Sequence, residues 1–117
     1  MPSPVEKNEV LQGTLDMLVL RTLRGGAQHG YAIARKIHDS SDGVVLVEEG
    51  SLYPALHRME RRGWIEARWG LSESKRKAKY YQLTTAGREQ LKVKQRMWNR
   101  MVAGIAGVMT ARPAAET

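Results

Sequence analysis

Few residues of this 117-residue chain are arranged for chemistry. It contains no cysteine, which excludes thiolate catalysis, disulfides and cysteine-ligated zinc. The three histidines, His29, His38 and His57, form no close-spaced pair of metal ligands. Serine, histidine and aspartate all occur, but no nucleophile elbow, phosphate-binding loop or metal signature arranges them. We therefore expect no enzyme active site, no metal and no cofactor.

Basic side chains are the one type of functional group that is concentrated in part of the chain. Its net charge is +7, from 19 Lys and Arg against 12 Asp and Glu. The first 57 residues are slightly acidic, and the excess of positive charge falls between residues 58 and 96. Its densest part is the run Lys75-Arg76-Lys77, followed by Lys79. A solvated helix surface is the plain explanation of a small excess, but its concentration in one stretch favours nucleic acid as the partner.

The length fits one domain of ordinary size. No apolar run approaches the ~20 residues that span a bilayer, and the N-terminus lacks the pattern of a secretory signal. These features predict a cytoplasmic protein. We expect flexible tails over residues 1–8 and 111–117, where prolines interrupt the patterning.

Three helices are predicted in the first half of the chain. Apolar residues recur at helical spacing over residues 10–24 and again over residues 29–40. A third helix is expected from Glu49 or Ser51 to about residue 62, with Ser51 as its N-cap and Pro54 in its first turn. The apolar segment 44–47 fits either a short strand or a buried loop.

In the second half of the chain, the hydrophobic pattern changes from helical spacing to one that favours strands. Residues 64–69 and 79–84 favour strands joined by a polar loop, a hairpin in which Trp64 and Trp69 are expected to be core residues. A last helix is predicted over residues 85–110, starting at a capping signal near Thr84. Its length of about 40 Å exceeds what so small a domain can cover, so a partner helix is expected.

The order helix, helix, helix, hairpin, long helix predicts a mainly α (α+β) protein. We expect a winged helix-turn-helix over residues 9–84, in which the second and third helices form the helix-turn-helix and the hairpin is the wing. Residues 85–110 would then form a C-terminal dimerisation helix.

Four stretches of the chain resemble the PadR family of bacterial transcriptional regulators. They are LQGTLDMLVLRTL at 11–23, HGYAIARKI at 29–37, EGSLYPALHRMERRGWI at 49–65 and RKAKYYQLTTAGREQL at 76–91. The resemblance implies a winged helix with a C-terminal dimerisation element, here of the short type with one helix. The chain departs from the family at the wing, where a glycine-arginine turn is common and residues 72–78 read SESKRKA.

In this fold the third helix would enter the major groove, and the wing would follow the phosphate backbone. The resemblance also implies that backbone amides at the start of the second helix meet a phosphate. The candidate DNA-binding residues are Gly30, Tyr31, Ser51, Tyr53, Pro54, His57, Arg58, Arg61, Lys75, Arg76, Lys77 and Lys79.

The long helix carries an aromatic residue, Trp98, among basic neighbours. In some short PadR-like proteins the corresponding region lines a cavity between subunits that accepts flat hydrophobic compounds, and plain dimer packing is the alternative. The residues of this effector pocket or dimer interface would be Leu11, Leu15, Met17, Met97, Trp98, Met101 and Ile105.

The sequence thus predicts a sequence-specific regulator that binds double-stranded DNA as a homodimer on an inverted repeat. By family habit it would be a repressor, relieved by a small hydrophobic effector. Two alternatives remain open: a non-specific or architectural nucleic-acid-binding protein, and a helical protein-interaction module without a DNA role.

Overall fold

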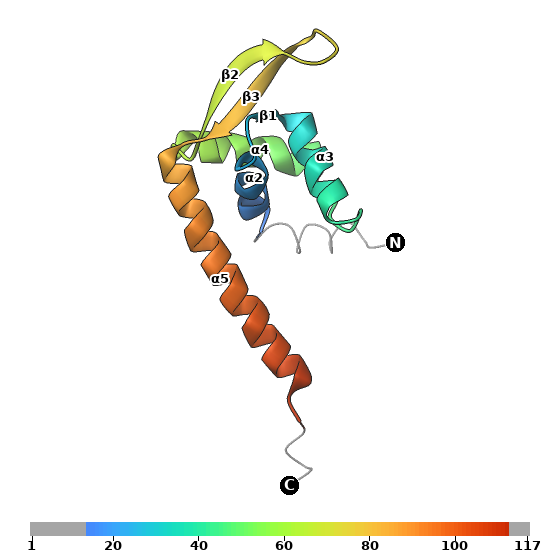
Figure 1. The fold of residues 1–117 in the computed structure, drawn as a ribbon, viewed down its shortest axis with the longest axis vertical. Helices are drawn as coiled ribbons and strands as arrows, with labels where there is room; N and C mark the ends of the chain where they lie inside the picture. Colours follow the sequence, from blue (N-terminus) through green and yellow to red (C-terminus); the bar gives the residue numbers. More distant parts are fainter. Residues whose placement is uncertain (1–13, 113–117) are drawn as a thin grey trace.

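The computed structural model describes residues 14–112, which form four helices, a small antiparallel sheet and their connections (Figure 1). This arrangement confirms the predicted mainly α winged helix with a long C-terminal helix. The predicted tail over residues 1–8, and all of the other tail except Ala111 and Arg112, lie outside the described residues. In chain order the elements are α2 (Leu15–Leu23), β1 (Gln28–His29), α3 (Gly30–Ser40), α4 (Glu49–Arg61), β2 (Ile65–Leu71), β3 (Lys77–Leu83) and α5 (Thr85–Thr110).

Helix α2 occupies the middle of the domain and packs against α3, α4 and α5. Residues 10–13 of the predicted first helix lie outside the described residues. Because α2 has neighbours on several sides, Leu20 is fully buried together with Leu15, Val19 and Leu23. This helix therefore packs on more than one side.

Helix α3 begins one residue later than predicted because His29 is its N-cap. The Nδ1 atom of His29 accepts a hydrogen bond from the backbone N–H of Ala32 at 3.2 Å. Ile33 and Ile37 are buried, as the helical spacing predicts. The following segment 44–47 is a loop in which Val47 is buried and Val44 is exposed.

Helix α4 starts at Glu49, with Glu48 as its N-cap residue, so Ser51 is not the cap that the sequence predicts. Pro54 consequently lies in the second turn and not the first. Its missing N–H leaves the carbonyl of Gly50 without a helical donor, but Gly50 is exposed and open to water. An acidic residue in the first turn, Glu49, suits the positive end of the helix dipole.

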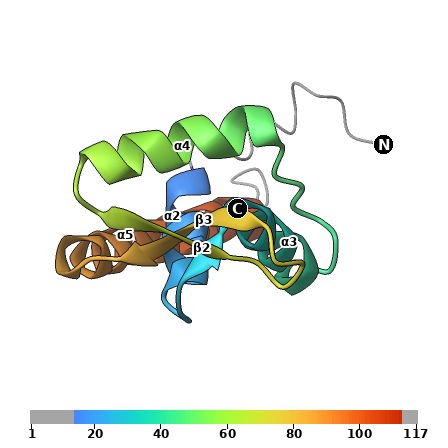
Figure 2. The same ribbon diagram turned by 90° about the horizontal axis from the view of Figure 1, so that it is seen from above.

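The sheet contains one strand that the sequence pattern does not predict. Its order is β1-β3-β2, with both pairs antiparallel. Strand β1 has only two residues, too few to show a period. In the hairpin, Ile65 lies opposite Leu83 and Ala67 opposite Tyr81, and this face covers the core. Figure 2 shows α4 running alongside the hairpin.

The two tryptophans of the hairpin have different surroundings. Trp64 is half-buried and packs against the core, as predicted. Trp69 is 65% exposed, so its assignment to the hairpin core is wrong. The register places Trp69 opposite Lys79, beyond the last core pair. There the hairpin extends past the helices and has nothing to pack on (Figure 1).

Thr84 connects the hairpin to α5 and confirms the predicted capping signal. Its Oγ1 accepts a hydrogen bond from the N–H of Gly87 at 3.0 Å and donates one to the carbonyl of Gly63 at 2.6 Å. One hydroxyl therefore caps α5 and ties it to the turn before β2.

Replacing Thr84 by alanine is expected to lower the free energy of unfolding by about 1–2 kcal/mol, because both hydrogen bonds are lost. Thr85→Ala is the matched control, since the neighbouring side chain is exposed. Chemical denaturation of both variants checks this, and equal losses would contradict the capping role.

Candidate nucleic-acid interface

Helix α4 has one buried and one exposed side. Its buried residues are Leu52, Ala55, Leu56 and Met59, which join the core. The opposite side carries a hydroxyl, a phenol, an imidazole, a guanidinium and a proline ring, a mixture suited to reading base edges. We call this side the outer face of α4; it consists of Ser51, Tyr53, Pro54, His57 and Arg61, of which all but the half-buried Ser51 are exposed.

Arg58, also a predicted DNA contact, is engaged inside the protein. Its Nη2 lies 2.5 Å from a carboxylate oxygen of Asp16 in α2. The Asp16 side chain is only 16% exposed, so this ion pair is shielded from solvent better than a surface pair. Arg58 thus fastens α4 to α2 and is not part of the outer face.

The predicted contacts at the start of α3 separate into one that is exposed and one that is covered. Tyr31 is 66% exposed and stacks beside His29, with ring centroids 6.5 Å apart. Gly30 is buried, and a Cβ at this position would lie 2.8 Å from the phenol oxygen of Tyr53. The structure therefore presents the Tyr31 side chain, while Tyr53 covers Gly30.

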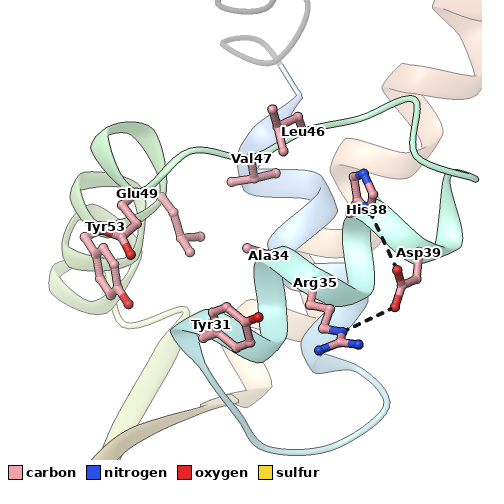
Figure 3. Close-up of a pocket in the computed structure, with 10 residues that line it drawn as sticks. Tyr31, Ala34, Arg35, His38, Asp39, Leu46, Val47, Glu49 and Tyr53 are labelled. Atoms are coloured by element: carbon pink, nitrogen blue, oxygen red, sulfur yellow. Dashed lines mark ion pairs between the residues drawn. The ribbon is translucent and has the colours of Figure 1, made fainter.

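A groove of about 510 Å³ lies between α3, the loop before α4 and the first turns of α4 (Figure 3). Tyr31 and Tyr53 are part of its wall, and Val47 and Leu52 are buried beneath it. At its edge, Oδ2 of Asp39 lies 3.9 Å from Nε of Arg35, and Oδ1 of Asp39 lies 3.7 Å from Nδ1 of His38. Sequence reasoning missed this groove because helical spacing reveals the Arg35–Asp39 pair but not how α3 and α4 face each other.

The tip of the wing consists of residues 72–76, shorter than the predicted loop because both strands extend further. The N–H of Ser72 donates to the carbonyl of Arg76 at 2.8 Å, and the N–H of Lys75 donates to the carbonyl of Ser72 at 2.8 Å. The Ser72 hydroxyl also accepts the Arg76 N–H at 3.2 Å. Lys75 has φ = 60°, a left-handed conformation that favours glycine. The departure from the glycine-arginine pattern is thus accommodated by serine hydrogen bonds and one strained lysine.

The four basic wing residues that are predicted to contact DNA differ in their partners. Lys75 and Arg76 are exposed and form no ion pair within residues 14–112. Lys77 is exposed and lies over the ring of Trp69, 5.5 Å from its centroid. Lys79 is half-buried and pairs with Glu60 of α4 at 3.4 Å, so it joins the wing to α4. The tip and the first residue of β3 therefore hold three accessible positive charges.

Tyr81 lies beneath this junction and is almost fully buried. The ammonium group of Lys79 lies over its ring at 5.6 Å. Burial raises the pKa of the Tyr81 phenol above its ordinary value, and the nearby Glu60 and Tyr53 raise it further.

The structure does not bring the predicted effector-pocket residues together within one chain. Leu15 is buried in the core, and Met17 packs partly against it. Leu11 lies outside the described residues. The other four, Met97, Trp98, Met101 and Ile105, are exposed along α5.

Two kinds of feature are absent from residues 14–112. These residues contain no group of three or more acidic, histidine or cysteine side chains that could hold a metal ion. In the same part of the chain, no helix is both long and apolar enough to cross a membrane.

Comparison with known proteins settles the family. The model of the family described as "Transcriptional regulator PadR-like family" matches residues 19–93, from α2 to the third turn of α5. The chain belongs to this PadR-like family of transcriptional regulators. The match confirms the resemblance seen in the sequence and includes α4 and the wing.

Solved structures of PadR-like proteins have the same fold. A PadR-like transcriptional regulator from Bacillus cereus is 28% identical, with a TM-score of 0.77 over 89% of this chain and 99% of its own. A PadR family regulator from Eggerthella lenta is 31% identical, with a TM-score of 0.75 over 89% and 88%. A transcriptional regulator from Clostridium thermocellum is 31% identical, with a TM-score of 0.76 over 84% and 95%. An uncharacterized protein of Lysinibacillus sphaericus is also similar, 28% identical over 92 residues that cover 79% of this chain and 84% of that protein.

A double-mutant cycle with Asp16→Ala and Arg58→Ala is expected to give a coupling free energy of about 1 kcal/mol in unfolding experiments, because each variant leaves a partly buried charge unpaired. The exposed pair of Arg35 and Asp39, both 67% exposed, is the control and is expected to couple by less than about 0.5 kcal/mol. Equal coupling in the two pairs would show that Arg58 does not fasten α4.

The raised pKa of Tyr81 predicts a loss of stability at alkaline pH. The unfolded chain releases this phenol proton near pH 10, whereas the folded protein holds it to a higher pH. The free energy of unfolding therefore falls as the pH rises above about 10. Tyr81→Phe removes this contribution, so its denaturation curves should shift less between pH 9 and pH 11 than those of the wild type. Equal shifts would count against a proton held at Tyr81.

Proposed function

We propose that this PadR-like chain is a homodimeric repressor that binds double-stranded DNA sequence-specifically in the cytoplasm. The observation that carries the proposal is the pairing of the exposed outer face of α4 with a basic wing tip. Helix α4 and the wing both lie at the end of the molecule opposite the C-terminal end of α5 (Figure 1). They are tied together by the Lys79–Glu60 ion pair.

The two surfaces would have different roles on DNA. Positive charge at the tip and at the adjoining start of β3, from Lys75, Arg76 and Lys77, suits contacts to phosphates. Tyr53 and Pro54 offer apolar contact to a thymine methyl, and His57 offers a polar contact to a base edge. Arg61, Tyr31 and Ser51 would add contacts at the margin. We leave Arg58, Lys79 and Gly30 out of the direct contacts, because each is engaged or covered within the protein.

A homodimer is supported by the apolar surface of α5. Beyond Leu91 none of the described residues of this helix is buried. A row of large apolar residues would be left in water, a surface that marks an interaction site. A second copy is the occupant we propose, since two such helices can pair around a two-fold axis. The row comprises Met97, Trp98, Met101, Val102, Ile105, Val108 and Met109.

The two-fold axis would require an inverted-repeat operator with half-sites about one helical turn, ~34 Å, apart. Repression would be relieved by a small hydrophobic compound that enters between the subunits near Trp98 and favours another spacing of the wings. The flexible side chains of Met97 and Met101 suit an adaptable apolar wall. The sequence also predicts Leu11, Leu15 and Met17 for this interface; of these, the buried Leu15 is better explained by the core.

The proposal is tested by binding to DNA from upstream of the chain's own gene and to scrambled duplexes, across a salt series. Preference for one sequence by about 10³-fold or more supports a specific regulator. Equal, salt-sensitive binding to all duplexes would favour an architectural protein. No binding at low salt would favour a protein-interaction module.

Two substitutions separate phosphate from base contacts. Lys75→Ala should weaken binding to all duplexes alike and reduce the salt slope by about one charge, because it removes a phosphate contact. His57→Ala should lower affinity for the preferred sequence by about 5- to 150-fold and leave scrambled DNA almost unchanged. Lys92→Ala is the control, since that exposed lysine lies on α5 and pairs with Glu89. Equal losses on both duplexes for His57→Ala would remove base reading from α4.

A further inference from the structure

Helix α5 is attached to the DNA-binding domain through a small area. Of its 26 residues only Gly87 and Leu91 are buried, both in its first two turns. The rest of the helix extends away from the domain as a straight rod (Figure 1). The angle between α5 and the domain must therefore be set at this short contact.

The residue before α5, Thr84, is hydrogen-bonded to residues 63–64, which follow the C-cap residue of α4. The carbonyl of Trp64 accepts the N–H of Thr84 at 3.1 Å, and the carbonyl of Gly63 accepts the Thr84 hydroxyl at 2.6 Å. The N–H of Trp64 in turn donates to the carbonyl of Met59 in α4 at 3.0 Å. The end of α4 and the start of α5 are thus bonded to the same short turn.

The closest approach is at Gly87. A Cβ at this position would lie 2.0 Å from the carbonyl oxygen of Trp64 and 2.9 Å from its carbonyl carbon. These are backbone atoms and cannot turn aside as the end of a side chain could. Any larger residue must push α5 away from Trp64, so the present angle requires glycine.

The indole ring of Trp64 forms a second link between the two helices. The guanidinium of Arg62, the C-cap residue of α4, lies 5.1 Å from its ring centroid. The ammonium of Lys94, in the third turn of α5, lies 5.2 Å from the same ring. Both distances are within the range of cation–π attraction. The ring therefore couples the C-terminal end of α4 to α5 one turn beyond the last buried residue, Leu91.

The length of α5 magnifies the angle at this junction. From Gly87 to Thr110 the helix extends about 35 Å, so a tilt of roughly 10° moves its far end by about 6 Å. One base pair of B-DNA rises about 3.4 Å. A small change of tilt therefore matches a change of one or two base pairs between two recognition helices related by the dimer axis.

We propose that the junction of Trp64, Gly87 and Lys94 determines which half-site spacing the homodimer accepts. The inference rests on the proposed function, because it needs a dimer that reads two half-sites with α4. It makes these three residues positioning residues for specificity that touch no DNA themselves.

The first test uses Gly87→Ala with Gly107→Ala as the matched control. Gly107 also lies in α5, but a Cβ added there would have nothing within 4 Å, and helical spacing places it away from Met101 and Ile105. Half-sites selected by the wild type from random duplex DNA are joined as inverted repeats with spacers varied one base pair at a time. Gly87→Ala should move the preferred spacing by one base pair or more, and Gly107→Ala should leave it unchanged.

Lys94→Gln keeps the proposal testable if Gly87→Ala does not fold. It removes the cation above Trp64 without changing the backbone contact. The affinity ratio between the best spacing and its neighbours should fall about 2- to 5-fold, because the angle is held less firmly. Lys92→Gln is the control, since Lys92 pairs with Glu89 on another side of α5. A merely destabilised domain would lose affinity at every spacing equally.

A distance measurement tests the geometry without DNA. The chain has no cysteine, so Arg61→Cys gives each protomer one spin label at the end of α4. The label-to-label distance in the dimer should change in Gly87→Ala and broaden in Lys94→Gln. Unchanged distances and unchanged spacing preference in both variants would overturn the inference.

Failure of the proposed function would give different results from failure of this inference. A wild type that binds every duplex equally would remove the sequence-specific regulator, while the label distances would still report on the junction. A labelled Arg61→Cys protein with no other substitution that shows no label-to-label distance is monomeric, and this overturns the dimer and the inference together.

Discussion

The burial of Leu52, Leu56 and Met59 of α4 in the core is the constraint on which the other elements depend. These side chains are almost completely removed from water, which fixes the rotation of α4 about its own axis. The side that remains exposed is then determined without any further interaction. The Arg58–Asp16 ion pair joins α4 to α2. Backbone hydrogen bonds of Trp64 link the end of α4 to the start of α5. The buried side of α4 therefore determines which side of the helix is exposed.

Much of this arrangement could be predicted because it depends on short-range patterns. The helical spacing of Ile33 and Ile37 and the capping residue Thr84 both operate within a few residues. Strand β1 could not be predicted from its two residues, since only its pairing with β3 makes it a strand. The partner of Arg58 lies 42 residues away in sequence, so a pattern along α4 cannot reveal it.

The positive charge of residues 58–96 illustrates the same limit. The total charge indicates a polyanionic partner, but in the structure the cations fall into two groups: those engaged within the protein and those accessible at the wing. Arg58 and Lys79 pair with acidic residues, while Arg62 and Lys94 lie over Trp64. The tip of the wing keeps its charge available to a ligand. Composition measures the number of cations, and only three-dimensional pairing tells which of them hold the protein together.

The hydrogen bonds that Ser72 makes within the wing tip affect the free energy of binding to a ligand. They order the backbone before any partner arrives, and the strain at Lys75 is met during folding. A flexible basic loop would lose backbone entropy of about 1–2 kcal/mol for each residue that it ordered on a ligand. This tip loses mainly side-chain entropy, so more of the attraction between its cations and an anionic surface remains as net affinity.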